Sequence, residues 1–355
     1  MALTDPTIEL REGEELDIKA VDACLKAHLP SLWGVPVVRQ FPGGASNLTY
    51  LLSYPDRALV LRRPPLGRKA HGAHDMRREY HVLKGLVGQF DYSPHPVLLC
   101  TDDLMIGTPF YVMERLQGVI LRKDLPAPLG LDAQATALLC KSFVDRLVEL
   151  HQVDYRACGL ESLGRPEGYV QRQIASWSER YTRALTPDAP GWQQVMTWLQ
   201  DKCPGDSGRA SLIHNDYRFD NVIVDTNNPV RISGVLDWEL ATVGDPLMDL
   251  GNCLAYWVEA GDPEPVLRTR RQPSNAPGML TRAEMVAYYA ERAGVSVGTF
   301  DFYYVQGLFR LAGIVQQLYY RYYHRHTRDP RFAHFVSLNT LLEQMSLRVI
   351  HQSNL

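Results

Sequence analysis

The chain has 355 residues, of which 45% are hydrophobic and 22% are charged, and its formal net charge at pH 7 is −3. These values are ordinary for a globular protein with room for two domains, and they argue against extensive disorder. The chain has no excess of basic residues, which would favour a nucleic acid or an anionic membrane surface as a partner. No apolar run reaches the roughly 18 residues that a membrane helix needs.

Six cysteines are scattered along the chain without a CxxC pair. This usage favours a reducing compartment and argues against a zinc site or a disulfide framework. The first 17 residues are acidic and lack the apolar core of a signal peptide. We therefore expect a cytoplasmic protein, monomeric or homodimeric, whose partner is neither a nucleic acid nor a membrane.

Strand signals surround a single helix in the first part of the chain. The expected strands, rich in β-forming residues, are 48–53, 58–62, 96–100 and 109–116. The first two are joined by a turn-like segment, residues 54–56, and form a hairpin. A helix is expected at 75–88, with Asp75 as its N-cap and Gly88 at its end.

The rest of the chain is mostly helical. Apolar residues at helical spacing predict helices at 132–151, 167–182, 191–202, 249–260, 281–292, 299–323 and 331–350. The first of these helices is expected to bury Leu138, Leu139, Phe143, Leu147 and Leu150. A β-rich island with strands at 211–214, 221–224 and 232–236 interrupts the helices, and residues 261–278 are expected to form a loop.

Polar side chains concentrate on the loops of this β-rich island. Asp216 and Asn221 lie five residues apart on one loop, and Asp237 ends the hairpin that follows. Phosphoryl transfer needs a carboxylate to orient the attacking hydroxyl and oxygen ligands to hold Mg²⁺ against the phosphates. The spacing of these three residues fits that requirement, although a single loop aspartate is more often a turn or cap residue.

Three motifs in the island carry a family resemblance. H-x-D-(x4)-N begins at His214, and L-D-W-E and G-D-P-x-x-D-L follow it, ending at Leu250. Together they resemble the aminoglycoside phosphotransferase/choline kinase family, and the sequence looks most like the phosphotransferase domain of acyl-CoA dehydrogenases 10 and 11. The resemblance covers roughly residues 30–325.

This resemblance implies an α+β fold of the protein-kinase-like, two-lobed type. Residues 1–116 would form a nucleotide-binding lobe with a helical N-terminal extension, an antiparallel sheet and one helix. Residues 117–355 would form a larger, mostly helical lobe with the catalytic loop, the metal site and the substrate pocket. The implied activity is an ATP- and Mg²⁺-dependent kinase for the hydroxyl group of a small molecule.

The resemblance also assigns roles in the second lobe. Asp216 matches the catalytic base, and Asn221 and Asp237 match magnesium ligands. His214 and Asp249 match residues that brace the catalytic loop, and His214 is expected to be buried and hydrogen-bonded. Two further acids lie beside the motifs. Asp220 is interpreted as a loop-stabilising or solvated residue, and Glu239 is a candidate secondary ligand.

The nucleotide site is expected in the first lobe. The loop before the first expected strand offers Gly43, Gly44, Ser46 and Asn47 to the phosphates, although a simple β-turn explains the same residues. Arg62 matches the position that lysine usually takes in kinases, and strand alternation allows either Arg62 or its neighbour Arg63 to face the cleft.

Three more residues complete this lobe's site. Glu79 matches the helix glutamate that pairs with the phosphate-binding cation, and its alternative is a solvated helix charge. The segment 111–118 matches the hinge between lobes, so backbone groups of Glu114 and Leu116 are expected to bind adenine.

The phosphate acceptor is less defined by the sequence. Arginines recur in the second lobe, and they favour an anionic or CoA-linked hydroxy substrate unless they are ordinary solvated charges. They are Arg165, Arg172, Arg180, Arg183, Arg268, Arg270 and Arg271. A hydroxyacyl-CoA follows from the resemblance alone. The alternatives are an aminoglycoside or amino-alcohol kinase, a nucleotide-binding pseudokinase and a metal-dependent phosphohydrolase.

Overall fold

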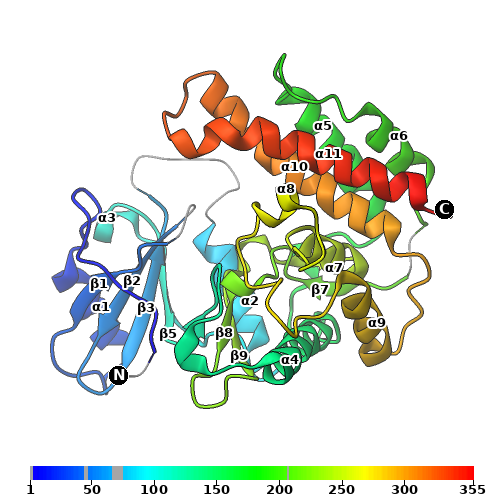
Figure 1. Ribbon diagram of the computed structural model, residues 1–355. Helices are drawn as coiled ribbons and strands as arrows, with labels where there is room; N and C mark the ends of the chain where they lie inside the picture. The colour runs from blue at the N-terminus through cyan, green and yellow to red at the C-terminus, as the bar shows by residue number, and fades with distance from the viewer. Residues whose placement is uncertain (1–2, 44–46, 66–74, 206–207) are drawn as a thin grey trace.

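The computed structural model describes residues 3–43, 47–65, 75–205 and 208–355. A smaller part built around an antiparallel sheet lies beside a larger, mostly helical part (Figure 1). The smaller part is mainly blue to cyan in the figure, and the larger part is mainly green to red. This arrangement confirms the expected α+β, two-lobed, protein-kinase-like fold. The exact division after residue 116 stays a prediction.

The sheet of the smaller part has five strands in the order β1-β2-β3-β5-β4, and all neighbours are antiparallel. The strands are β1 (Val37–Gln40), β2 (Leu48–Ser53), β3 (Ala58–Arg63), β4 (Pro96–Cys100) and β5 (Phe110–Glu114). Four of the five were expected from their β-forming residues. The signal of β1 is short and was missed.

Two helices cover opposite faces of this sheet. Helix α1 (Ile18–His28) buries Leu25 in the same apolar cluster as Tyr50 and Leu61 of the sheet. Helix α2 (Met76–Leu86), capped by Asp75 as expected, shares its cluster with Val60, on the other face. Because side chains alternate along β3, each face of the sheet receives every second residue.

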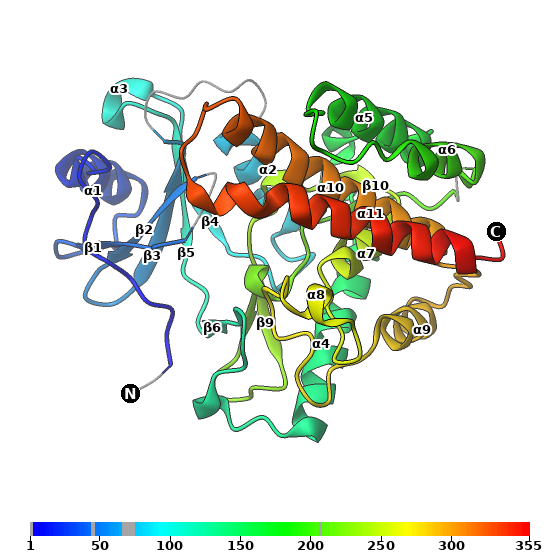
Figure 2. The same ribbon diagram turned by 45° about the horizontal axis from the view of Figure 1, so that its top comes forward.

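The larger part is assembled around α10 (Asp301–Tyr323), which packs against α5, α7 and α11. Figure 2 shows α11 running alongside α10, with α5 and α6 beyond them. The other helices are α3 (Asp103–Ile106), α4 (Ala133–His151), α5 (Tyr169–Arg183), α6 (Gln193–Asp201), α7 (Pro246–Ala255), α8 (Glu264–Leu267), α9 (Arg282–Ala293) and α11 (Phe335–Gln352). Among the described residues, no helix combines the length and the apolar character that crossing a bilayer requires.

Three expectations for this part need correction. Helix α7 begins at Pro246 rather than at Asp249, because Asp245 caps it by accepting a hydrogen bond from the Leu247 amide. The expected loop at 261–278 contains the short helix α8. Leu138 is 51% exposed, because it and the buried Leu139 are adjacent and point in directions about 100° apart on the helix.

The β-rich island forms two small antiparallel sheets, in the orders β10-β7 and β6-β8-β9. The strands of these sheets are β6 (Val119–Ile120), β7 (Ser211–Ile213), β8 (Val222–Val224), β9 (Ile232–Val235) and β10 (Thr242–Gly244). Of these, β6 and β10 lie outside the segment expected for the island. The apolar side chains of β7 and β8 are buried. These buried strands fix the ends of the loops that carry Asp216, Asn221 and Asp237.

Candidate active site

A cavity of about 590 Å³ lies between the sheet and the β-rich island. Residues from both parts of the chain line it. The expected site residues that line it are Gly43, Asn47, Arg62, Glu79, Glu114, Leu116, Asp216, Asn221 and Asp237. Gly44 and Ser46 lie outside the described residues. We call this cavity the cleft.

The loop after β7 is held by a buried carboxylate. Asp249 on α7 is fully buried and accepts hydrogen bonds from the amides of His214 at 2.8 Å and Asn215 at 2.7 Å. The Nε2 atom of His151 lies 3.1 Å from the same carboxylate. Burial opposes ionisation, but the interactions with His151 and His214 outweigh it and lower the pKa of Asp249.

His214 joins this loop to the next one. Its side chain is buried, and its Nδ1 atom accepts a hydrogen bond from the Asp216 amide at 3.2 Å. Nε2 therefore carries the proton, and it donates to the Leu236 carbonyl at 2.8 Å. The imidazole spans the interior between the segment that presents Asp216 and the segment that presents Asp237.

Asp216 and Asn221 are in direct contact within the cleft. The side-chain amide of Asn221 donates to the main-chain carbonyl of Asp216 at 2.8 Å and to its Oδ2 atom at 2.9 Å. This fixes the orientation of the amide and leaves the Oδ1 atom of Asn221 without a hydrogen bond among the described residues. An oxygen held in this way is the type of ligand that Mg²⁺ prefers.

Arg218 is a cleft residue that sequence reasoning missed. Its Nη2 atom donates to Asp216 at 3.2 Å and lies 3.3 Å from Asp220, and its guanidinium lies 4.5 Å from the centre of the Tyr256 ring. Burial raises the pKa of Asp220, and the charge of Arg218 opposes that rise. The available signal was an arginine two residues after the expected base, on the same short loop.

Asp237 follows β9 in the left-handed conformation, with φ of +67°. Aspartate tolerates this region better than most residues, because its short side chain can form local hydrogen bonds. A hydrogen bond of 2.8 Å between the Leu236 amide and the Asn221 carbonyl holds the two loops together just before this turn. The turn places the Asp237 carboxylate in the same cavity as Asn221 and Asp216.

Arg62 connects the sheet to the β-rich island. Its two terminal nitrogens donate to Glu79 on α2 at 2.5 Å and to Asp237 at 2.9 Å. Glu79 is 1% exposed, and burial raises its pKa while the charge of Arg62 lowers it. A cation and two carboxylates from three distant segments thus meet at one point of the cleft.

Strand alternation separates Arg62 from its neighbour. Arg63 points to the opposite face of the sheet, where it donates to the Tyr50 hydroxyl at 2.9 Å and to the Glu14 carbonyl at 2.9 Å. It is 1% exposed and does not line the cleft. Arg62 is therefore the arginine of this pair that faces the cavity.

Glu239 lies in the same group of charges. Its Oε2 atom accepts a hydrogen bond from the Asn47 side chain at 2.9 Å and lies 3.9 Å from Arg62. This contact ties the expected phosphate-binding loop to the segment after Asp237. Glu239 is accordingly a hydrogen-bonded residue of the cleft.

The inner end of the cleft is apolar. Val60, Leu83 and Met113 line it. The backbone amide of Glu114 is already bonded to the His95 carbonyl at 2.8 Å. An adenine ring at this end would therefore meet the carbonyl rather than the amide of Glu114.

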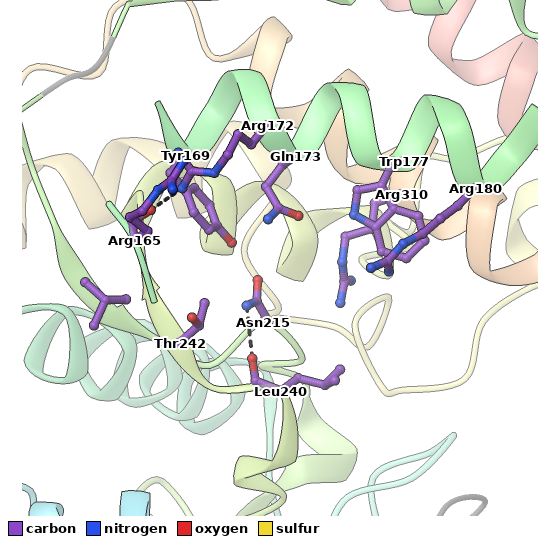
Figure 3. Close-up of a pocket in the computed structure, with 11 residues that line it drawn as sticks. Arg165, Tyr169, Arg172, Gln173, Trp177, Arg180, Asn215, Leu240, Thr242 and Arg310 are labelled. Carbon is purple, nitrogen blue, oxygen red and sulfur yellow. Dashed lines mark hydrogen bonds between the residues drawn. The ribbon is translucent and has the colours of Figure 1, made fainter. Parts of the chain in front are cut away.

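The arginines of the larger part divide into two groups. Arg165, Arg172 and Arg180 line a second cavity, of about 340 Å³, beside the cleft (Figure 3). Of the seven arginines singled out from the sequence, the other four lie outside both cavities, and three of these pair with carboxylates. These pairs are Arg183 with Glu179, Arg268 with Glu264, and Arg270 with Asp124.

Comparison with known proteins places this geometry in context. The model of the phosphotransferase enzyme family matches residues 37–285. Acyl-CoA dehydrogenase family member 11 of Rattus norvegicus is 33% identical over 328 residues, which cover 91% of this chain and 42% of that protein. Family member 10 of Mus musculus is 35% identical over 285 residues, which cover 79% of this chain and 26% of that protein.

The chain thus spans less than half the length of these two relatives. The crystal structure of a protein from Ralstonia eutropha JMP134, described as an aminoglycoside phosphotransferase, superposes on this chain with a TM-score of 0.81 at 28% sequence identity. The match covers 96% of this chain and 100% of the other. These findings confirm the resemblance that the three motifs indicated.

Proposed function

The chain belongs to the phosphotransferase enzyme family and is a phosphotransferase that acts on a hydroxyl group, and from this premise we propose that it uses ATP and Mg²⁺ to phosphorylate a hydroxyacyl-CoA or a related hydroxy acid. The observation that carries the proposal is the meeting of Arg62 and Asp237 in a cleft that also holds Asp216 and Asn221.

The donor set of the cleft fits Mg²⁺. The Oδ1 atom of Asn221 and the carboxylate of Asp237 are hard oxygen ligands, and both residues line the same cavity. When bound there, Mg²⁺ would neutralise charge on the phosphates of the nucleotide. The bond from Arg62 to one oxygen of Asp237 holds this carboxylate in place beforehand.

The smaller part supplies the nucleotide contacts. The apolar end of the cleft accepts adenine, with hydrogen bonds to the carbonyl of Glu114 and the amide of Leu116. Arg62 contacts the α- and β-phosphates, and Glu79 orients it. Gly43 and Asn47, which line the cleft, would lie beside the phosphates.

Asp216 acts on the acceptor. It accepts a hydrogen bond from the substrate hydroxyl and orients the oxygen for in-line attack on the γ-phosphorus. The new O–P bond forms as the bond from the γ-phosphorus to the bridging oxygen of ADP breaks, and the hydroxyl proton passes to Asp216. Asn221 and Arg218 hold the carboxylate in position, so that catalysis consists mainly of orientation and charge neutralisation.

A panel of acceptors tests this proposal. Purified protein is incubated with Mg²⁺-ATP and a 4-hydroxyacyl-CoA, an amino alcohol or an aminoglycoside, and products are identified by mass spectrometry. We expect a phosphorylated hydroxyacyl-CoA. Phosphorylation of the aminoglycoside alone would refute the preferred acceptor.

Other outcomes point to other activities. ATP binding without turnover of any acceptor would favour a nucleotide-binding scaffold. Phosphate ester hydrolysis with tightly bound transition metal would favour a phosphohydrolase.

A further inference from the structure

The second cavity adjoins the cleft at the catalytic loop. Leu240 and Arg310 line both cavities, and Asn215, the residue before Asp216, lines the second one. Figure 3 shows Trp177, Arg180 and Arg310 gathered at one end and Arg165 with Arg172 at the other. The two cavities therefore share a boundary at Leu240 and Arg310, and the second cavity reaches the residue that precedes Asp216.

The lining of this cavity carries four positive charges and no negative ones. Arg165, Arg172, Arg180 and Arg310 contribute to it, and no aspartate or glutamate does. None of the four guanidinium groups forms an ion pair with a carboxylate of the described residues. We call these four residues the arginine pocket.

Among the four residues of the arginine pocket, Arg310 most strongly indicates an anionic ligand. It lies in the middle of α10 and is 7% exposed. Its guanidinium carbon lies 5.6 Å from the centroid of the Trp177 ring. Removing a cation from water without a counter-charge is costly, and such positions are usually paired with an acid or an anionic ligand.

The surrounding groups hold the arginines in position. Arg180 lies over the same Trp177 ring, 4.8 Å from its centroid, so that one indole orients two guanidinium groups. Arg172 donates to the backbone carbonyls of Glu167 and Arg165. Guanidinium groups fixed in this way can bind a planar or tetrahedral oxyanion through paired hydrogen bonds.

We propose that the arginine pocket binds an anionic group, a phosphate or a carboxylate, of the same acceptor whose hydroxyl lies at Asp216. This inference rests on the proposed function and specifies the charge of its substrate. The pocket attracts anionic acceptors and repels cationic ones, so it selects the acceptor independently of the chemistry at the γ-phosphate.

The test compares three acceptors that share one 4-hydroxyacyl group. The CoA thioester carries phosphates, the free acid carries a carboxylate, and the N-acetylcysteamine thioester is neutral. The variants are Arg310→Gln and Arg180→Gln. The matched control is Arg268→Gln, which removes one charge from an exposed pair with Glu264, outside the arginine pocket.

We expect the wild-type protein to have a higher kcat/KM for a charged acceptor than for the neutral one. In Arg310→Gln the ratio of these two values should fall about 10- to 100-fold, through a higher KM for the charged acceptor. Arg180→Gln should show a smaller fall, and the control should match the wild type. The charged acceptor that responds identifies phosphate or carboxylate as the bound group.

Binding measurements separate this inference from the proposed function. Calorimetric titration of the hydroxyacyl-CoA and of the free acid without nucleotide should show weaker binding to Arg310→Gln and Arg180→Gln than to the control. If these acceptors bind through the arginines but are never phosphorylated, the proposed function is wrong, whereas the assignment of the arginine pocket as an anion-binding site is confirmed.

If both variants keep the wild-type ratio of kcat/KM between charged and neutral acceptors and the wild-type binding affinity, the arginine pocket does not bind the anionic group. This conclusion would hold whether or not phosphate is transferred. Because Arg180 is exposed, its variant reports on binding even if Arg310→Gln unfolds. Thermal melting of each variant shows which of them keep the fold.

Discussion

The two neighbouring cavities treat charge in opposite ways. In the cleft, Arg62 is bonded to Glu79 and Asp237, and Arg218 is bonded to Asp216. In the arginine pocket, four cations face a cavity with no acid in its lining. These charged groups of the cleft are therefore already paired, and the proposed Mg²⁺-nucleotide would add a cation together with phosphates. The cations of the arginine pocket have no acid in the lining to pair with, and they would bind an anion.

The contrast separates two tasks of one enzyme. Under the proposed function, the paired charges of the cleft would hold Asp216 and Asp237 in place before the nucleotide binds, which is the arrangement that phosphoryl transfer requires. Unpaired cations in the pocket provide affinity and selection, because their desolvation is compensated when an anion enters. Variants in the cleft should thus change turnover and stability, and variants in the pocket should change acceptor preference.

The largest effect is expected from Asp216→Ala. Removing the group that orients the hydroxyl and accepts its proton should lower kcat by about 10³- to 10⁴-fold. Binding of Mg²⁺-ATP, measured by calorimetry, should persist, because Arg62 and Asp237 remain. Near-normal turnover in this variant would exclude Asp216 as the base.

Arg62→Met should destabilise the fold itself. It leaves Glu79, which is 1% exposed, without its ion-pair partner, at an expected cost of about 3–5 kcal/mol in the free energy of unfolding. The double variant Arg62→Met/Glu79→Leu should recover much of this loss.

Arg180→Gln, in the arginine pocket, serves as the comparison for stability. It should change the free energy of unfolding by less than about 0.5 kcal/mol, because Arg180 is exposed. Urea unfolding measures all three variants. Equal losses for Arg62→Met and Arg180→Gln would break the comparison between the two cavities.

Asp249→Asn tests the support of the catalytic loop through pH. Because the pKa of Asp249 is lowered on folding, its ionised form contributes stability above its ordinary value of 3.8, and this contribution is lost as pH falls through the folded pKa. At pH 7 the variant should be less stable than the wild type by about 2–3 kcal/mol. The difference should shrink as the pH is lowered below 3.8; a constant difference would contradict the assignment.

Asp237→Ala is expected to have the smallest effect of the four cleft and loop variants. Losing one oxygen ligand should weaken Mg²⁺-nucleotide binding about 10- to 100-fold while Asn221 stays in place. Titration of ATP with and without Mg²⁺ measures this. If ATP affinity without Mg²⁺ falls equally, Asp237 acts on the fold rather than on the metal.

The sequence was most informative where chemistry is local. Asp216 and Asn221 lie on one loop between buried strands, so their spacing, together with the family resemblance, indicated that they would meet. Most helices and four strands of the sheet were likewise recovered from their periodicity. The roles of Asp216, Asn221 and Asp237 stay predictions until variants are measured.

Long-range geometry was beyond the sequence. Alternation allowed either Arg62 or Arg63 to face the cleft, and the choice depends on helix α1, which covers the face that receives Arg63. Arg310 lies in the helix between the apolar residues Phe309 and Leu311, and no local feature shows that it borders two cavities. Arg165, Arg172 and Arg180 were singled out together with arginines that pair elsewhere.

The central claim is that the cleft holds Mg²⁺-ATP between the two parts of the chain with its γ-phosphate directed at Asp216. A crystal structure with Mg²⁺ and a non-hydrolysable ATP analogue tests it most directly. The account predicts a metal ion about 2.0–2.1 Å from the Oδ1 atom of Asn221 and from a carboxylate oxygen of Asp237. A nucleotide bound with its phosphates away from Asp216, or a metal ion that contacts neither ligand, would contradict it.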